Sequence, residues 1–90
     1  MILDVKKPHF SADQMKKYIE LRMSQIGQSI KIERKRRGLT QGELSKISGV
    51  GINFVSQAES GKVTLHTGKL IQLLNTLGLD LVVDAKRERN

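Results

Sequence analysis

Two short amphipathic segments joined by a glycine-containing turn lie in the middle of the chain and limit the folds open to it. Thr40 with Glu43 three residues later is a capping-box pattern, in which each side chain accepts a hydrogen bond from the backbone N–H of the other residue. We therefore predict a helix over residues 40–47, with Leu44 and Ile47 as its buried stripe.

The second segment begins after a break at Ser48 and Gly49. Its pattern predicts a helix over residues 51–59, with Val55 and Ala58 on its inner side. Two short helices joined by a tight turn that contains glycine are typical of the helix-turn-helix motif. The sequence thus predicts this motif between residues 40 and 61.

Two further helices are expected before the motif. Ser11 and Gln14 form another capping-box pattern, which predicts a helix over residues 12–23. A second helix is expected over residues 25–37, and Gly27 is interpreted as the separation between the two.

A last helix and a strand are expected after the motif. Leucines at spacings of three and four predict a helix over residues 67–77. Residues 79–83 then alternate with a period of two, which indicates a strand. Because one strand is not stable alone, it must pair with an N-terminal arm containing a short strand over residues 2–5, or with the same strand of a second subunit.

The chain is strongly basic, and its charge is unevenly distributed. Sixteen Lys and Arg against nine Asp and Glu give a formal net charge of +7, of which residues 1–39 carry +6. This surplus favours a polyphosphate partner, although charge alone is equally consistent with a solvated surface. With two Phe, one Tyr and no Trp, the chain is better suited to duplex than to single strands stacked on aromatic rings.

The composition also argues against several classes of protein. Without cysteine, disulfides, zinc knuckles and thiol catalysis are excluded. No apolar run approaches the roughly 20 residues that cross a bilayer, so we expect no membrane partner and a cytoplasmic, nucleoid-associated protein. A chain of 90 residues has little room for a catalytic cleft, and His9 and His66 lie far apart without acidic clusters. We therefore predict no catalytic residues, no metal site and no cofactor.

The motif residues resemble a known family. Two stretches carry the resemblance, GLTQGELS over residues 38–45 and FVSQAESGK over residues 54–62. They resemble the Xre or lambda-repressor-like helix-turn-helix family, with similarity extending over residues 25–79. More narrowly, residues 59–64 and 68–81 are similar to the HipB-type antitoxins.

The resemblance implies a fold and a division of the chain. The implied fold is mainly α, a lambda-repressor-like helix-turn-helix bundle of about five helices with a C-terminal β-strand that pairs across a dimer. The implied parts are an N-terminal extension (1–24), a DNA-binding domain (25–78) and a dimerisation strand with a short basic tail (79–90). The expected dimer-strand residues are Leu79, Leu81, Val82 and Val83.

The resemblance also assigns residues to DNA. The positions expected to contact bases from the recognition helix are Gly51, Ile52, Asn53, Ser56 and Gln57. Asn and Gln can pair bidentately with adenine, whereas Ile52 can only offer a methyl contact to thymine and is also a candidate core residue. Gln41, preceded by Thr40, resembles the family's phosphate-binding glutamine at a helix N-terminus, where an anion is already favoured.

Other residues near the motif are candidates for phosphate contact or for holding the motif in place. The basic candidates for phosphate contact are Lys35, Arg36, Arg37, Lys62 and Lys69, of which the three consecutive ones are equally typical of a solvated face. Arg34 and Glu59 match positions that form a structural ion pair in the family, which sets the angle of the recognition helix.

The implied function is sequence-specific repression by a homodimer on a palindromic double-stranded DNA operator. The narrower resemblance implies an antitoxin that regulates its own operon and forms a complex with a HipA-like kinase toxin. Two alternatives remain open, a stand-alone Xre-type repressor and a protein-interaction module with little DNA specificity.

Overall fold

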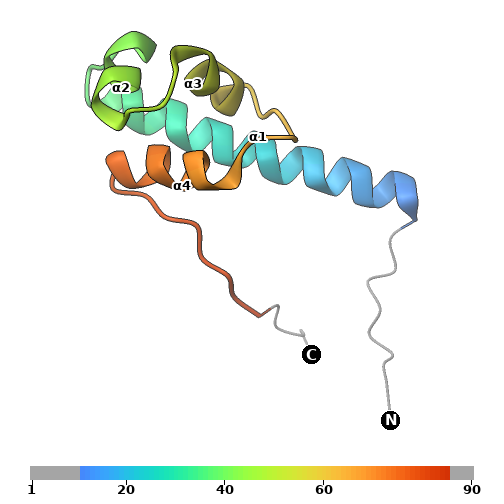
Figure 1. The fold of residues 1–90 in the computed structure, drawn as a ribbon. Helices are drawn as coiled ribbons and strands as arrows, with labels where there is room; N and C mark the ends of the chain where they lie inside the picture. The colour runs from blue at the N-terminus through green and yellow to red at the C-terminus, as the bar shows by residue number, and fades with distance from the viewer. Residues whose placement is uncertain (1–10, 86–90) are drawn as a thin grey trace.

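The computed structural model describes residues 11–85, which form four helices and contain no strand. The helices are α1 (Ala12–Arg36), α2 (Gln41–Ser48), α3 (Ile52–Glu59) and α4 (Thr67–Thr76). The last three gather on the C-terminal half of α1, whose N-terminal half extends beyond them (Figure 1). We call residues 12–22, which form this projecting part, the α1 overhang. The strand expected over residues 2–5 and the basic tail after residue 85 lie outside the described residues.

α1 is one continuous helix, so the prediction of two helices here was wrong. Its start at Ser11 agrees with the capping box, since the Ser11 hydroxyl accepts a hydrogen bond from Gln14 N at 3.1 Å. Gly27 lies inside this helix and does not end it. α3 packs so closely here that a Cβ atom would lie 2.5 Å from the Ala58 carbonyl oxygen, which explains the need for glycine. α1 therefore runs across residues 24 and 25, where the N-terminal extension was expected to end.

The predicted positions of α2, α3 and α4 are confirmed to within one residue at each end. α2 follows the capping box of Thr40, and its C-cap is Gly49, whose φ of 81° is left-handed and therefore suits glycine. Gly51 is the N-cap of α3 and provides no side-chain hydrogen bond. His66 is the N-cap of α4, and its Nδ1 accepts a hydrogen bond from Lys69 N at 3.2 Å.

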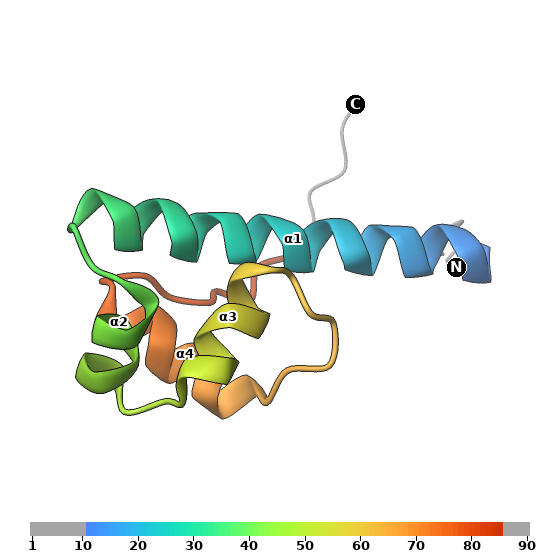
Figure 2. The same cartoon turned by 90° about the horizontal axis from the view of Figure 1, so that it is seen from above.

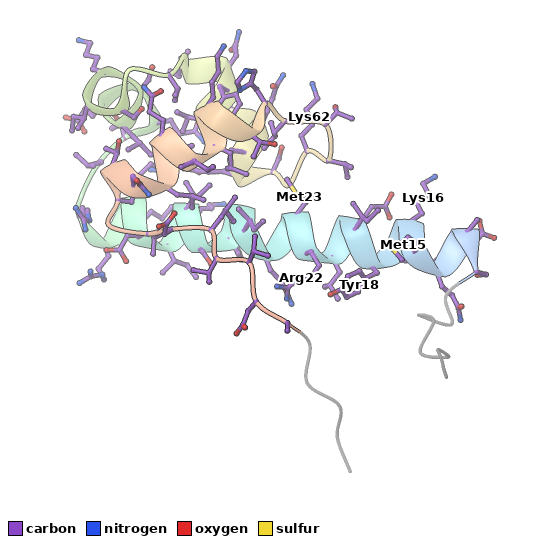
Figure 3. The ribbon with its side chains drawn as sticks, turned by 60° about the horizontal axis from the view of Figure 1, so that its bottom comes forward. Met15, Lys16, Tyr18, Arg22, Met23 and Lys62 are labelled. Carbon is purple, nitrogen blue, oxygen red and sulfur yellow. The ribbon has the colours of Figure 1, made fainter. Side chains whose placement is uncertain are left out.

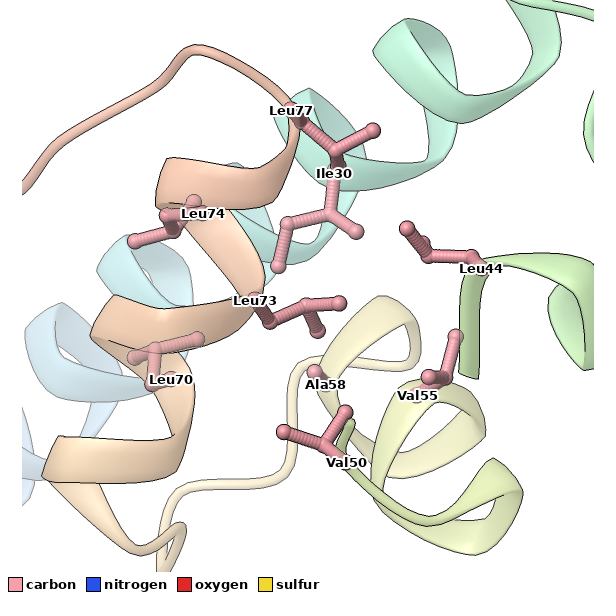
Figure 4. Close-up of a cluster of buried hydrophobic side chains, with 9 residues drawn as sticks. All are labelled: Ile30, Leu44, Val50, Val55, Ala58, Leu70, Leu73, Leu74 and Leu77. Carbon is pink, nitrogen blue, oxygen red and sulfur yellow. The ribbon is translucent and has the colours of Figure 1, made fainter. Parts of the chain in front are cut away.

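The core is a cluster of aliphatic side chains from all four helices and the α2–α3 turn (Figure 4). Its buried members are Ile30, Leu44, Val50, Val55, Ala58, Leu70, Leu73, Leu74 and Leu77. Ile47 was predicted to be buried but is 61% exposed. The buried residues of α2 are Leu44 and Ser48, one turn apart, so the face turned to the core is narrow and excludes Ile47.

The segment after α4 corrects the expectation of a strand. Leu79 packs against the core, and its carbonyl accepts a hydrogen bond from Asn75 Nδ2 at 2.7 Å. Leu81, Val82 and Val83 are exposed and belong to no strand. Within residues 11–85 no other segment is extended as a strand beside them, and a ladder cannot form without a partner.

No helix in the described part of the chain is both long and apolar enough to cross a bilayer.

Candidate nucleic-acid interface

An ion pair fixes the end of α3 against α1. Nε of Arg34 lies 2.6 Å from Oε2 of Glu59, and Nη2 of Arg34 lies 3.0 Å from Oε1. The two side chains are only 10% and 4% exposed. Nη1 of Arg34 also donates to the Leu39 carbonyl at 2.7 Å, so one side chain connects α1, the α1–α2 loop and α3. The structure thus brings together the two residues that the sequence resemblance had paired.

This contact shifts the pKa of both partners. The hydrogen bond to Glu59 raises the pKa of the Arg34 guanidinium. Burial acts to raise the pKa of Glu59, but hydrogen bonds from Arg34 and Gln41 outweigh it, and the pKa lies below its ordinary value of 4.5. Glu59 is therefore a carboxylate at neutral pH and serves as a fixed acceptor for both neighbours.

α3 turns one face toward the core and the opposite face toward solvent. Val55 and Ala58 are buried. All the residues predicted to contact bases are exposed, namely Gly51, Ile52, Asn53, Ser56 and Gln57. Ile52 is 52% exposed, so its alternative interpretation as a core residue was wrong. Hydroxyl and amide groups therefore lie on the open side of a helix whose other side is firmly packed.

The start of α2 lies beside the end of α3. Oγ1 of Thr40 accepts a hydrogen bond from Glu43 N at 3.0 Å, and Oε1 of Glu43 accepts one from Thr40 N at 2.8 Å. Nε2 of Gln41 donates to Oε1 of Glu59 at 3.1 Å. Gln41 is therefore positioned by Glu59, and its second amide N–H leaves it able to donate to another acceptor.

The three consecutive basic residues at the end of α1 have different surroundings. Nη2 of Arg36 lies 2.5 Å from Oε2 of Glu33, and Nε of Arg37 lies 3.2 Å from the same oxygen. Nη2 of Arg37 also donates to the Leu77 carbonyl at 3.0 Å, where α4 ends. Lys35 forms no ion pair with any residue between 11 and 85. Only Lys35 of the three therefore has its charge unpaired within the described chain.

A polar pocket of about 340 Å³ lies between α1, the start of α2 and the end of α3. Its lining residues are Lys31, Arg34, Lys35, Gln41, Ser56, Glu59 and Ser60. Since Arg34 already balances Glu59, Lys31 and Lys35 give the pocket a positive charge next to the outward face of α3. Sequence reasoning missed Lys31, although its position one helical turn before Lys35 places both on one side of α1.

The remaining candidates lie apart from this pocket. Lys62 follows α3 in the α3–α4 loop (Figure 3), and Lys69 lies in the first turn of α4; both are exposed. His66 accepts the capping hydrogen bond of α4, which gives it a structural role. Among residues 11–85 no group of three or more His, Cys, Asp or Glu could hold a metal ion, and His9 lies outside this range.

Comparison with known proteins adds two findings. Residues 30–83, which include all of α2, α3 and α4, match the family model described as helix-turn-helix. The chain is also similar to y4mF of Sinorhizobium fredii (strain NBRC 101917 / NGR234), an uncharacterized HTH-type transcriptional regulator. The two are 42% identical over 64 residues, which cover 71% of this chain and 84% of the relative.

Proposed function

The chain belongs to the helix-turn-helix family, and from this premise we propose that it regulates transcription by binding double-stranded DNA through α3. The observation that carries the proposal is the outward face of α3, where Asn53, Ser56 and Gln57 are exposed. The other side of α3 is fixed by the Arg34–Glu59 pair. A helix fits the major groove, where each base pair shows a distinct pattern of donors and acceptors.

We propose two kinds of contact with the duplex. Asn53 and Gln57 pair with base edges, Ser56 donates or accepts one hydrogen bond, Ile52 packs on a thymine methyl group, and Gly51 lets the start of α3 approach the bases. Contacts to phosphate would come from the start of α2 and the flanking basic residues, namely Thr40, Gln41, Lys35, Lys62 and Lys69. Arg36 and Arg37 are weaker candidates because Glu33 binds both.

We further propose that two copies bind a palindromic operator and repress transcription from it. One recognition helix reads only a few base pairs, so repressors of this kind pair two half-sites roughly 34 Å apart. The exposed apolar side chains of Leu81, Val82 and Val83 support pairing of residues 79–83 with the same segment of a second copy.

The resemblance of residues 59–64 and 68–81 to HipB-type antitoxins supports a narrower proposal. In it, the protein represses its own operon and binds a HipA-like kinase toxin encoded beside it. Co-purification with the product of the neighbouring reading frame tests this proposal. A stand-alone repressor would bind its operator equally well and retain no such partner.

The DNA-binding proposal is tested by fluorescence anisotropy with the duplex upstream of the gene and a shuffled duplex of the same composition. We expect the upstream duplex to bind about 10³-fold more tightly or better, with log affinity falling linearly as log salt rises. Equal affinity for both duplexes, or no binding to either, would overturn the proposal.

A further inference from the structure

The α1 overhang and the α3–α4 loop form an apolar groove at one end of the molecule. The groove has a volume of about 510 Å³ and is lined by Ala12, Met15, Lys16, Ile19, Glu20 and Val63. Ile19 and Val63 are 40% and 45% exposed. Figure 2 shows the overhang and the loop at the same end, and Figure 3 shows Met15 and Lys16 on the projecting part of α1. A concave apolar surface open to water marks a place where another surface docks.

The groove continues the stripe by which α1 packs on the core. Met23, Ile26 and Ile30 contact the core, and Ile19 and Met15 continue this stripe toward the start of the helix at spacings of four. α1 thus has one apolar side along its whole length, but α2, α3 and α4 cover only its second half. The overhang also precedes residues 30–83, which match the family, so the groove is a feature of this chain beyond that match.

We propose that a second copy of this chain docks in the groove, with its overhang antiparallel to the first around a two-fold axis. In such an interface every contact between two residues occurs twice. In an antiparallel pair of helices, residues that share a midpoint along the helix face each other. Met15 and Ile19 have their midpoint at Lys17, and Lys16 and Glu20 have theirs at Tyr18. These midpoints are one residue apart, so a two-fold axis between them leaves each facing pair offset by only about 1.5 Å along the helix. Both contacts can therefore form, twice each, in a single arrangement.

The faces of the helix agree with this arrangement. At about 100° per residue, Met15 and Ile19 lie within the stripe, whereas Lys16 and Glu20 lie along one flank of it. The interface would therefore have apolar contacts along its centre and two ion pairs along one edge. Within residues 11–85 neither Lys16 nor Glu20 forms an ion pair, so both charges remain for a partner. This reciprocal charge pattern favours a second copy as the occupant.

Sedimentation equilibrium of the full chain without DNA tests the ion pairs. Lys16→Glu places like charges opposite each other and should weaken dimerisation about tenfold, as should Glu20→Lys. The variant carrying both changes exchanges the charges and should restore the wild-type dissociation constant. Lys17→Glu is the matched control, because it makes the same change in charge on another face of α1.

Disulfide trapping tests the contact between Met15 and Ile19 separately from any pairing through residues 79–83. The chain has no cysteine, so introduced thiols are the only ones present. A mixture of Met15→Cys and Ile19→Cys chains should form covalent dimers faster than Met15→Cys alone. It should also be faster than a mixture in which Leu21→Cys, on the opposite face, replaces Ile19→Cys.

A wild-type chain that stays monomeric would overturn the proposal. It would also be overturned if Lys16→Glu and Glu20→Lys dimerised as strongly as Lys17→Glu. The same holds if the mixture of Met15→Cys and Ile19→Cys chains formed covalent dimers no faster than the mixture with Leu21→Cys. The inference does not rest on DNA binding, and its failure would leave the proposed binding of DNA through α3 standing because no measurement here contains DNA.

Discussion

Arg34 and Glu59 meet at two points, with N–O distances of 2.6 and 3.0 Å, and join the last turn of α1 to the last turn of α3. Glu59→Gln would leave the Arg34 guanidinium largely buried without its counter-charge. We expect the free energy of unfolding to fall by about 2 to 3 kcal/mol. This is less than the roughly 3 to 5 kcal/mol for a fully enclosed pair, because the pair borders the polar pocket. Urea denaturation measures the change.

Glu33→Gln is the control for this measurement. Glu33 also holds two arginines, but Arg36 and Arg37 are exposed, so solvent screens the interaction and little stability should be lost. If Glu59→Gln and Glu33→Gln lost the same free energy of unfolding, burial of the Arg34–Glu59 pair would add nothing to stability.

The lowered pKa of Glu59 predicts a dependence of stability on pH. The unfolded chain, with the ordinary pKa of 4.5, takes up the proton at a higher pH than the folded chain does. The stabilisation is therefore fully present above pH 4.5 and is lost as the pH falls through the folded pKa. Unfolding free energies measured from pH 7 to pH 3 should fall less steeply below pH 4.5 for Glu59→Gln than for the wild type. Parallel curves would contradict the assignment.

The different surroundings of Gly27 and Gly42 predict that replacing each by alanine has opposite effects on stability. Gly27→Ala places a methyl group against the carbonyl oxygens of Ala58 and Glu59 and should cost about 1 to 3 kcal/mol despite the better helix propensity of alanine. Gly42→Ala in α2 would meet only Ile52 Cδ1 and Thr40 Oγ1, at ordinary distances of 3.7 and 3.9 Å, and should stabilise by roughly 0.5 to 1 kcal/mol. Thermal denaturation compares them, and a stabilising Gly27→Ala would refute the contact.

Base reading and phosphate contact can be separated by mutation. Asn53→Ala and Gln57→Ala should each cost about 1 to 3 kcal/mol on operator and much less on random duplex. Lys62→Ala should weaken binding to both duplexes alike and reduce the salt slope by about one. Binding isotherms at several salt concentrations distinguish the two patterns. Equal losses on both duplexes for Asn53→Ala would remove it from the base-reading residues.

Pairing of residues 79–83 between copies predicts the effect of Val82→Pro. Proline removes a backbone donor and prevents the pairing geometry, so dimerisation should weaken. Operator affinity should then fall about 10²-fold or more although α3 is intact, because two linked half-sites bind far more tightly than one. The circular dichroism spectrum should keep its helical signal. A variant that remains dimeric and binds operator normally would exclude the segment from the dimer contact.

Local signals predicted the motif helices well. The capping box at Thr40 and the stop at Gly49 depend only on neighbouring residues, and the structure contains both. Gly27 shows where such reasoning fails. A glycine within a helical pattern indicates either an end or a close approach by another element, and only the position of α3 decides between them.

The candidate site likewise has one part that the sequence predicts and another that depends on tertiary contacts. The outward face of α3 follows from helical spacing, and the exposed residues on it are those that the resemblance suggested. The differing surroundings of Lys35 and Arg37 depend on Glu33 and on the end of α4, which is 40 residues away from Arg37 in sequence. Adjacent basic residues look alike in a sequence, but their tertiary neighbours determine which charge is already paired.

Because α1 is one continuous helix, its length would set the distance between the two α3 helices in the assembled dimer. At 1.5 Å per residue, its 25 residues measure roughly 37 Å. One end carries the face proposed for the second copy, and the other carries Arg34, which holds α3. In a dimer joined through the overhangs, the separation and relative rotation of the two α3 helices would depend on the number of residues in this rod. Adding one residue within the overhang would both lengthen and rotate the rod, and the preferred spacing of operator half-sites would change with it.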